Sequence, residues 1–373
     1  MATVLGETAA SAPSTTSGAQ ALTPPGGRLL SLDAFRGFIM ITLAANGFAL
    51  RGLMKYPEWA WLGAQFEHID WVGVRFWDLI QPAFMFMVGV ALPFAIAARR
   101  RKGDTDSQIF RHVAWRALML ILWSQVIMSI SRGSLFFQLI NVLSQIGFAY
   151  LIAYLIFRLP MRAQAVTAAA VLAGHWALFI LFPGSEGPFS KTDNIGAVID
   201  RALGLNYSGY YVTINFLSSA VTTLFGAWTG KLLMEPGTHE RRMRIIGGAA
   251  LACLASGWML GLVNPMVKRI WTASFTMFSA GLVLLMLLAF YWLVEVRGYR
   301  KAVFPLLVVG ANSIFIYTLS IVLSGWLNKA VGVFTFNYGF LGPAGAIAQA
   351  ATVAAVMWYA CYWLYQRKIF FKF

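Results

Sequence analysis

A chain of 373 residues in which 59% are hydrophobic and only 12% are charged has too few polar residues to cover a soluble core of this size. The formal net charge of +15 does not indicate nucleic-acid binding, because the basic residues stand in short clusters between apolar runs and are not gathered on one polar domain. Composition therefore excludes a soluble globular protein and predicts one that is surrounded by the lipid bilayer.

The N-terminal segment differs in composition from the rest of the chain. It is rich in Ala, Ser, Thr, Pro and Gly, and it lacks the basic stretch and apolar core of a signal peptide. We predict a disordered cytoplasmic tail over residues 1–27 and a single transmembrane domain over residues 28–373.

Apolar runs follow one another through this domain at the length that a membrane-spanning helix needs, which is about 20 residues. They predict an all-α fold, a polytopic transmembrane helix bundle with about ten spans. The expected spans are residues 34–54, 77–98, 113–131, 135–157, 163–182, 213–234, 244–263, 271–294, 302–324 and 342–365.

The basic residues predict the orientation of this bundle. If the N-terminus is cytoplasmic, 20 of the 29 Lys and Arg residues fall on the cytoplasmic side of the alternating loops and nine on the other side. An excess of this kind across short loops is typical of cytoplasmic segments, so we expect both termini in the cytoplasm.

Charged residues within a membrane are costly to bury, which makes each of them a candidate for function. Asp33 and Arg36 stand at the start of the first expected span, three residues apart and therefore on one helix face. One interpretation is that they cap the helix and anchor it at the interface as an ion pair. The other is that they contact a polar substrate.

The most informative polar cluster lies between the first two expected spans, where His68 is followed by Asp78. An imidazole exchanges a proton near neutral pH, and a carboxylate can fix its tautomer and orientation. No second histidine stands at a metal-ligand spacing from His68, so the sequence predicts no metal site there.

Four stretches of the chain carry a resemblance to known proteins. They are SLDAFRG at residues 31–37, HxxWxG at 68–73 with DLxxPxFxFxxG at 78–89, KRIWTAS at 268–274, and GANSIFIY at 310–317. In this order they resemble the motifs of the heparan-α-glucosaminide N-acetyltransferase family, which consists of membrane enzymes. The resemblance extends over most of residues 28–365 and so concerns the whole membrane domain.

The resemblance implies acetyl transfer from cytosolic acetyl-CoA to an amine or hydroxyl of an extracytoplasmic saccharide. It makes His68 the catalytic residue, either as general base on the acceptor or as carrier of the acetyl group, and Asp78 the carboxylate that orients it. Asn46, an amide in the first expected span, is then an oxyanion donor or a structural hydrogen-bonding group. No metal cofactor is implied.

Substrate contacts are expected on both sides of the membrane. Basic groups near the cytoplasmic face would meet the phosphates of acetyl-CoA, and groups outside would meet the saccharide. Each of these residues also has a structural interpretation, as topology signal, interfacial anchor or helix-packing residue. The candidates for substrate binding are Asp33, Arg36, Trp71, Lys268, Arg269, Trp271 and Asn312.

Two segments depart from the family pattern. Residues 142–147 read VLSQIG where a Gln-Arg pair is common, and residues 210–215 read YYVTIN in place of an Asp-Pro-Glu-Gly-like stretch. Membership of a family does not fix the substrate, so the identity of the acceptor is open.

Two other classes of protein remain as alternatives. A transporter or flippase of an amphipathic small molecule would use the same polar groups for binding alone, and a membrane scaffold would use none of them. Binding of CoA separates the enzyme from both. The expected partners are the lipid bilayer, acetyl-CoA and a saccharide acceptor, with homo-oligomerisation left open. We expect a multi-pass protein of the cell inner membrane.

Overall fold

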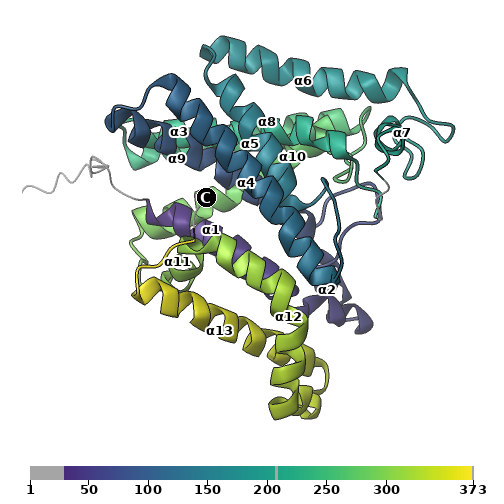
Figure 1. Ribbon diagram of the computed structural model, residues 1–373, viewed down its shortest axis with the longest axis vertical. Coiled ribbons are helices and arrows are strands. Elements are labelled where there is room, and N and C mark those ends of the chain that lie inside the picture. The colour runs from purple at the N-terminus through teal and green to yellow at the C-terminus, as the bar shows by residue number, and fades with distance from the viewer. Residues whose placement is uncertain (1–28, 206–208, 372–373) are drawn as a thin grey trace, which may run out of the picture.

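The protein's structure, a computed structural model, describes residues 29–205 and 209–371. The expected tail at residues 1–27 lies outside this part. Every regular element in these residues is a helix, which confirms the all-α fold (Figure 1). The elements are α1 (Leu30–Ala44), η1 (Asn46–Lys55), α2 (Ala60–Gln65), η2 (Phe76–Leu79), α3 (Ile80–Arg101), α4 (Asp106–Arg132), α5 (Val142–Phe157), α6 (Met161–Leu181), α7 (Ile195–Ala202), η3 (Thr213–Asn215), α8 (Phe216–Met234), α9 (His239–Gly261), α10 (Ala273–Tyr291), η4 (Trp292–Val296), α11 (Phe304–Ala311), α12 (Ser313–Thr335), η5 (Phe336–Ala344) and α13 (Gly345–Gln366).

Each expected span overlaps at least one of these helices, but the number of about ten spans is not confirmed. Within the described residues, six helical stretches are long and apolar enough to cross a membrane, or seven if the bent pair α1 and η1 forms one span. Helices such as α5 and α11 are shorter than a full crossing needs. The structure therefore has the helices of a multi-pass membrane protein.

Two of the expected spans are interrupted, which corrects the expectation of continuous helices. Residues 34–54 bend by 55° where α1 ends, because Asn46 adopts a left-handed φ of 47° that an α-helix cannot contain. Residues 302–324 are divided into α11 and α12 at Asn312, whose φ and ψ of −124° and 42° are also non-helical.

Glycines allow the central helices to approach each other closely. A Cβ atom on Gly89 of α3 would lie 1.8 Å from the carbonyl oxygen of Thr223 in α8, and one on Gly226 would lie 2.0 Å from that of Phe86. Small residues at such contacts are typical of membrane helices, because close approach of the backbones increases van der Waals contact. This contact holds the middle of α3 close against α8.

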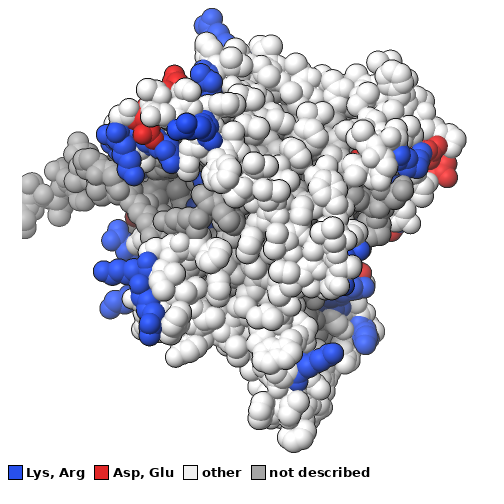
Figure 2. All heavy atoms as spheres, viewed as in Figure 1, with Lys and Arg blue, Asp and Glu red and all other residues white. Residues whose placement is uncertain are grey.

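α1 lies between two groups of helices. It packs on α11 and α12 on one side and on α3 and α10 on the other (Figure 1). Figure 2 shows Lys and Arg side chains gathered at the left of the view, around the end of the bundle where α3 carries three arginines in its last turn. Uncharged surface covers the middle of this face. The charge distribution agrees with the predicted orientation, which itself stays a prediction.

Candidate active site

Asp78 lies in η2, the short helical turn that leads into α3. Its side chain is 1% exposed, and its Oδ2 accepts the backbone N–H groups of Ile69 and Arg75, each at 3.2 Å. A carboxylate is favoured at a helix start, because it accepts N–H groups that have no partner within the helix. Asp78 therefore holds the loop of residues 69–75 against the end of α3.

His68 is placed on Asp78 by this loop. The Nδ1 atom of His68 lies 2.6 Å from Oδ1 of Asp78. Because the carboxylate only accepts hydrogen bonds, the short contact requires the proton on Nδ1. Nε2 then carries the lone pair that can accept a proton or attack a carbonyl carbon.

Lys268 completes a cluster of three residues that come from distant parts of the chain. Its Nζ lies 3.6 Å from Oδ1 of Asp78 and 3.3 Å from Nδ1 of His68, and its side chain is 6% exposed. With the proton of Nδ1 directed at Asp78, the ammonium group pairs with the carboxylate and not with the imidazole. The ion pair compensates two buried charges and leaves His68 as the group that can change its charge.

The surroundings favour the neutral imidazole. Burial lowers the pKa of His68 below its ordinary value, the hydrogen bond to Asp78 opposes this, and the positive charge of Lys268 lowers the pKa further. The net direction is downward. A neutral imidazole at neutral pH is the form that acts as a base or a nucleophile.

A cavity of about 330 Å³ adjoins His68. Aromatic and aliphatic side chains form most of its wall, among them Trp77, Ile80 and Phe84, and a few polar groups interrupt them. The His68 side chain is 40% exposed. Lys268, in the loop between α9 and α10, lines the same cavity. A mostly apolar cavity with a few convergent polar groups is typical of a small-molecule site.

A chain of buried amides leads from this cavity into the bundle. Gln81 lines the cavity and donates from Nε2 to Gln145, which donates to Oδ1 of Asn215 at 2.6 Å. Asn215 donates to the backbone carbonyl of Arg269 at 3.2 Å. Since a carbonyl only accepts, it fixes the orientation of each amide in turn and directs the Gln81 NH₂ group towards Gln145. Sequence reasoning missed Gln81, although it stands one helical turn after Asp78.

A second cavity, of about 270 Å³, lies nearer the arginine-rich end of the bundle. Arg36 and Arg116 line it, and Phe84 belongs to its wall as well as to that of the His68 cavity. Nε of Arg116 is buried and has no hydrogen-bond partner among the described residues. Arg36 pairs with Asp33 at 3.3 Å, as expected from their spacing.

Three of the expected substrate-binding residues make structural contacts. Trp71 donates from Nε1 to the carbonyl of Phe189 at 2.8 Å and so joins two loops that are distant in the sequence. Trp271 is fully buried and donates to Thr222 at 3.2 Å. Asn312 fixes the C-terminal segment, since its side chain donates to the carbonyl of Ile369 and accepts from the N–H of Phe371. A contact of these three residues with substrate stays a prediction.

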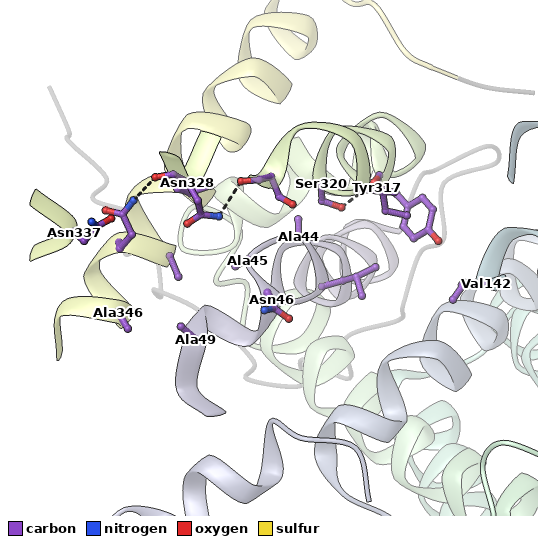
Figure 3. Close-up of a pocket in the computed structure, with 16 residues that line it drawn as sticks. Ala44, Ala45, Asn46, Ala49, Val142, Tyr317, Ser320, Asn328, Asn337 and Ala346 are labelled. Carbon is purple, nitrogen blue, oxygen red and sulfur yellow. Dashed lines mark hydrogen bonds between the residues drawn. The ribbon is translucent and has the colours of Figure 1, made fainter. Parts of the chain in front are cut away.

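Neither Arg269 nor Asn46 is among the residues that line the His68 cavity. The guanidinium of Arg269 faces the rings of Tyr210 and Tyr211 at 5.8 and 5.9 Å, and Tyr211 lines that cavity. Asn46 lines a third and larger cavity beside it (Figure 3). Its role as oxyanion donor stays a prediction.

This chain is similar in sequence to known proteins. The family model of the heparan-α-glucosaminide N-acetyltransferase catalytic region matches residues 28–256, which is more than half of the chain and includes His68 and Asp78. The chain belongs to the heparan-α-glucosaminide N-acetyltransferase family. The match ends before Lys268, so the third member of the cluster comes from outside the matched region.

Two relatives of this family are similar over almost the whole chain. The heparan-α-glucosaminide N-acetyltransferase of Homo sapiens is 23% identical over 94% of this chain and 60% of its own length. That of Mus musculus is 22% identical over 92% of this chain and likewise 60% of its own length. The chain thus spans about three fifths of the relatives that it matches.

The segment that departs from the family pattern has a defined place in the structure. Gln145, which stands where a Gln-Arg pair was expected, is the middle amide of the chain that begins at Gln81. A charged arginine at this buried position would require a counter-charge, whereas the amide of Gln145 requires only hydrogen bonds.

Among the described residues, no three His, Cys, Asp or Glu side chains gather as a metal site.

Proposed function

We propose that this protein is a membrane-bound acyltransferase that moves an acetyl group from cytosolic acetyl-CoA to an amine or hydroxyl of an extracytoplasmic saccharide. The observation that carries the proposal is the cluster of His68, Asp78 and Lys268 at the His68 cavity. The family of the chain supports the type of reaction, and the names of its relatives specify acetyl transfer.

The donor would enter from the arginine-rich end. Arg36 and Arg116 offer positive charge to the phosphates of CoA, and the unpartnered Nε of Arg116 offers a further donor. The pantetheine arm would pass Phe84, which the two cavities share, and bring the thioester to His68. Binding of the nucleotide part would position the reacting carbonyl, which converts a bimolecular encounter into an oriented reaction.

Nε2 of His68 would then perform the chemistry by one of two courses. As a base it takes the proton of the acceptor, whose nitrogen or oxygen attacks the thioester carbon, and returns the proton to the leaving CoA thiolate. As a carrier it attacks the carbonyl itself, the C–S bond breaks, and the acceptor later removes the acetyl group. In both courses the N–H of the Gln81 amide that is not donated to Gln145 would be offered to the carbonyl oxygen, with Asn46 from the neighbouring cavity as the alternative donor.

The test is acetyl-CoA turnover by the purified protein in detergent, with a panel of amino sugars and neutral saccharides as acceptors. We expect thiol release that depends on the saccharide, and a fall of at least about 100-fold in His68→Ala, the range for loss of a general base. His112→Ala, on α4 and not among the residues that line the His68 cavity, serves as the matched control.

Full activity of His68→Ala would contradict the proposed mechanism. Failure of the wild-type protein to bind CoA would contradict the acyltransferase itself, and movement of a solute without consumption of acetyl-CoA would favour a transporter. Equal thermal unfolding of the two variants excludes misfolding as the cause of lost activity.

A further inference from the structure

The largest of the three cavities has no part in the donor path. Its volume is about 670 Å³, within the range of roughly 300–1,000 Å³ in which small-molecule sites fall. It lies between the junction of α1 with η1 and the hairpin formed by α12, η5 and α13 (Figure 3). It shares Leu43, Val142 and Tyr317 with the His68 cavity, so the two are neighbours.

The wall of this cavity combines apolar and polar side chains and is uncharged. Small apolar side chains alternate with hydroxyl and amide groups, and no Lys, Arg, His, Asp or Glu is among the residues that line it. Such a wall can hydrogen-bond hydroxyl groups but offers no counter-charge to a sulfate, carboxylate or ammonium group. The polar residues are Asn46, Tyr317, Ser320, Ser324, Asn328, Asn337 and Gln349.

The polar groups extend from the mouth of the cavity to its floor. Asn46, Asn328 and Asn337 are exposed, whereas Gln349 and Tyr317 are 7% and 4% exposed. The hydroxyl of Tyr317 donates to Oδ1 of Asn141 at 3.4 Å, and Asn141 lines the His68 cavity. Hydrogen-bonding groups thus continue from the mouth to the cavity that contains His68.

Hydrogen bonds between the helices keep this wall in place. Gln349 donates from Nε2 to the carbonyl of Asn328 at 2.9 Å and accepts from the hydroxyl of Thr335 at 2.8 Å. Asn328 donates to the carbonyl of Ser324 at 2.9 Å. In Figure 3 the side chains of Asn328 and Asn337 lie at one end of the cavity and Tyr317 at the other. The cavity is therefore formed before a ligand arrives.

The mouth of the cavity is bordered by a strongly apolar hairpin. Phe334, Phe336 and Phe340 are 84%, 82% and 79% exposed, and they flank Asn337 in the sequence. Exposed aromatic side chains at the end of membrane helices are typical of contact with lipid. A ligand that enters beside them passes from the bilayer and not from open water.

We propose that this cavity holds the acceptor, an uncharged saccharide head carried on a lipid anchor. The inference rests on the proposed function and names its substrate class. The sugar would occupy the amide-lined cavity, and the lipid chain would lie along the exposed phenylalanines of the hairpin. An acidic or sulfated saccharide is disfavoured, because its charge would lose hydration without gaining a cation.

The transfer then balances without a further reactant. A hydroxyl of the sugar approaches Nε2 of His68 past Tyr317, its oxygen bonds to the acetyl carbon, and the C–S bond of the thioester breaks. The proton moves from the hydroxyl to His68 and from His68 to the CoA thiolate. The products are the O-acetylated glycolipid and CoA.

The experiment compares two variants of α13 in proteoliposomes with radiolabelled acetyl-CoA. Ala346 lines the cavity and Ala351 is exposed outside it, so Ala346→Phe fills the site and Ala351→Phe is the matched control. The acceptor probes are dodecyl glycosides of neutral hexoses, the methyl glycosides of the same sugars, and sulfated dodecyl glycosides.

We expect acetylation of the neutral dodecyl glycosides to exceed that of the other two sets by at least about tenfold, and Ala346→Phe to reduce it by a similar factor. Ala351→Phe should behave as the wild type, and both variants should bind CoA normally. Unchanged transfer in Ala346→Phe would refute the site. Preference for methyl or sulfated glycosides, or no transfer to any neutral glycoside by protein that binds acetyl-CoA, would refute the substrate class. Absence of CoA binding would instead refute the proposed function.

Discussion

Asp78 and Lys268 act on His68 in opposite directions. The carboxylate holds the proton on Nδ1 and favours the imidazolium, whereas burial and the ammonium group favour the neutral ring. The balance lies on the neutral side, and this suits a residue that has to receive a proton. Asp78 and Lys268 thus shift the pKa of His68 in opposite directions, and a pH profile of the activity can separate the two effects.

Replacement of Lys268 by Met should move the pH dependence of acetyl transfer. Because the neutral imidazole is the active form, activity is lost as the pH falls through the pKa of His68, which lies below its ordinary value. Removal of the ammonium charge makes protonation of His68 easier, so its pKa rises and the acid limb shifts to higher pH. The measurement is the rate of thiol release between pH 5 and pH 8, with the exposed Lys329→Met as control. If the acid limb of the pH profile stays in place or moves to lower pH, the Lys268 charge does not lower the pKa of His68.

Among the helices, the chain of amides determines how three segments meet. It joins α3, α5 and the loop before α8, and it ends on the backbone next to Lys268. The same chain therefore orients Gln81 at the cavity and fixes the loop that carries Lys268. Loss of its middle member leaves a donor and an acceptor buried without partners.

Gln145→Met, which keeps the length of the side chain, should lower both stability and activity. Unpaired polar groups of this kind cost about 1–3 kcal/mol, so we expect a fall of several degrees in the midpoint of thermal unfolding in detergent. Gln366→Met is the control, since Gln366 is exposed and its side chain donates to the hydroxyl of Tyr362. If the two variants unfold at the same temperature, the amide chain does not hold these segments together.

Apolar runs predicted the helices well, because a span in a bilayer has to satisfy its own backbone hydrogen bonds. The breaks at Asn46 and Asn312 were not predictable in this way, since hydropathy does not report the local φ and ψ, and Asn312 also bonds to a segment distant in the sequence. The pairing of His68 with Asp78 was expected from their motif. The approach of Lys268 was not, because nothing in a single sequence indicates that residues 200 positions apart are neighbours.

At the scale of the whole molecule, the His68 cavity adjoins both of the other cavities. The cavity with Arg36 and Arg116 meets the His68 cavity at Phe84, and the uncharged cavity meets the His68 cavity at Tyr317. Donor and acceptor would therefore reach His68 from different sides, and neither would have to leave before the other binds. An enzyme that joins two compartments needs this arrangement, because its two substrates do not share a solvent.

Arg116→Gln tests whether CoA binds in the cavity lined by Arg36 and Arg116. A hydrogen bond to a charged group contributes about 1.5–3 kcal/mol, so its loss should weaken CoA binding by about tenfold or more. The matched control is Arg111→Gln on the same helix, which is exposed and does not line the cavity. The dissociation constant of CoA, measured by titration of the purified protein, should rise for Arg116→Gln alone, while kcat at saturating acetyl-CoA stays within about threefold, as expected when only ground-state binding is lost. An equal effect of the two variants would mean that CoA responds to the overall charge of this end, and the phosphates would then have to lie outside the cavity.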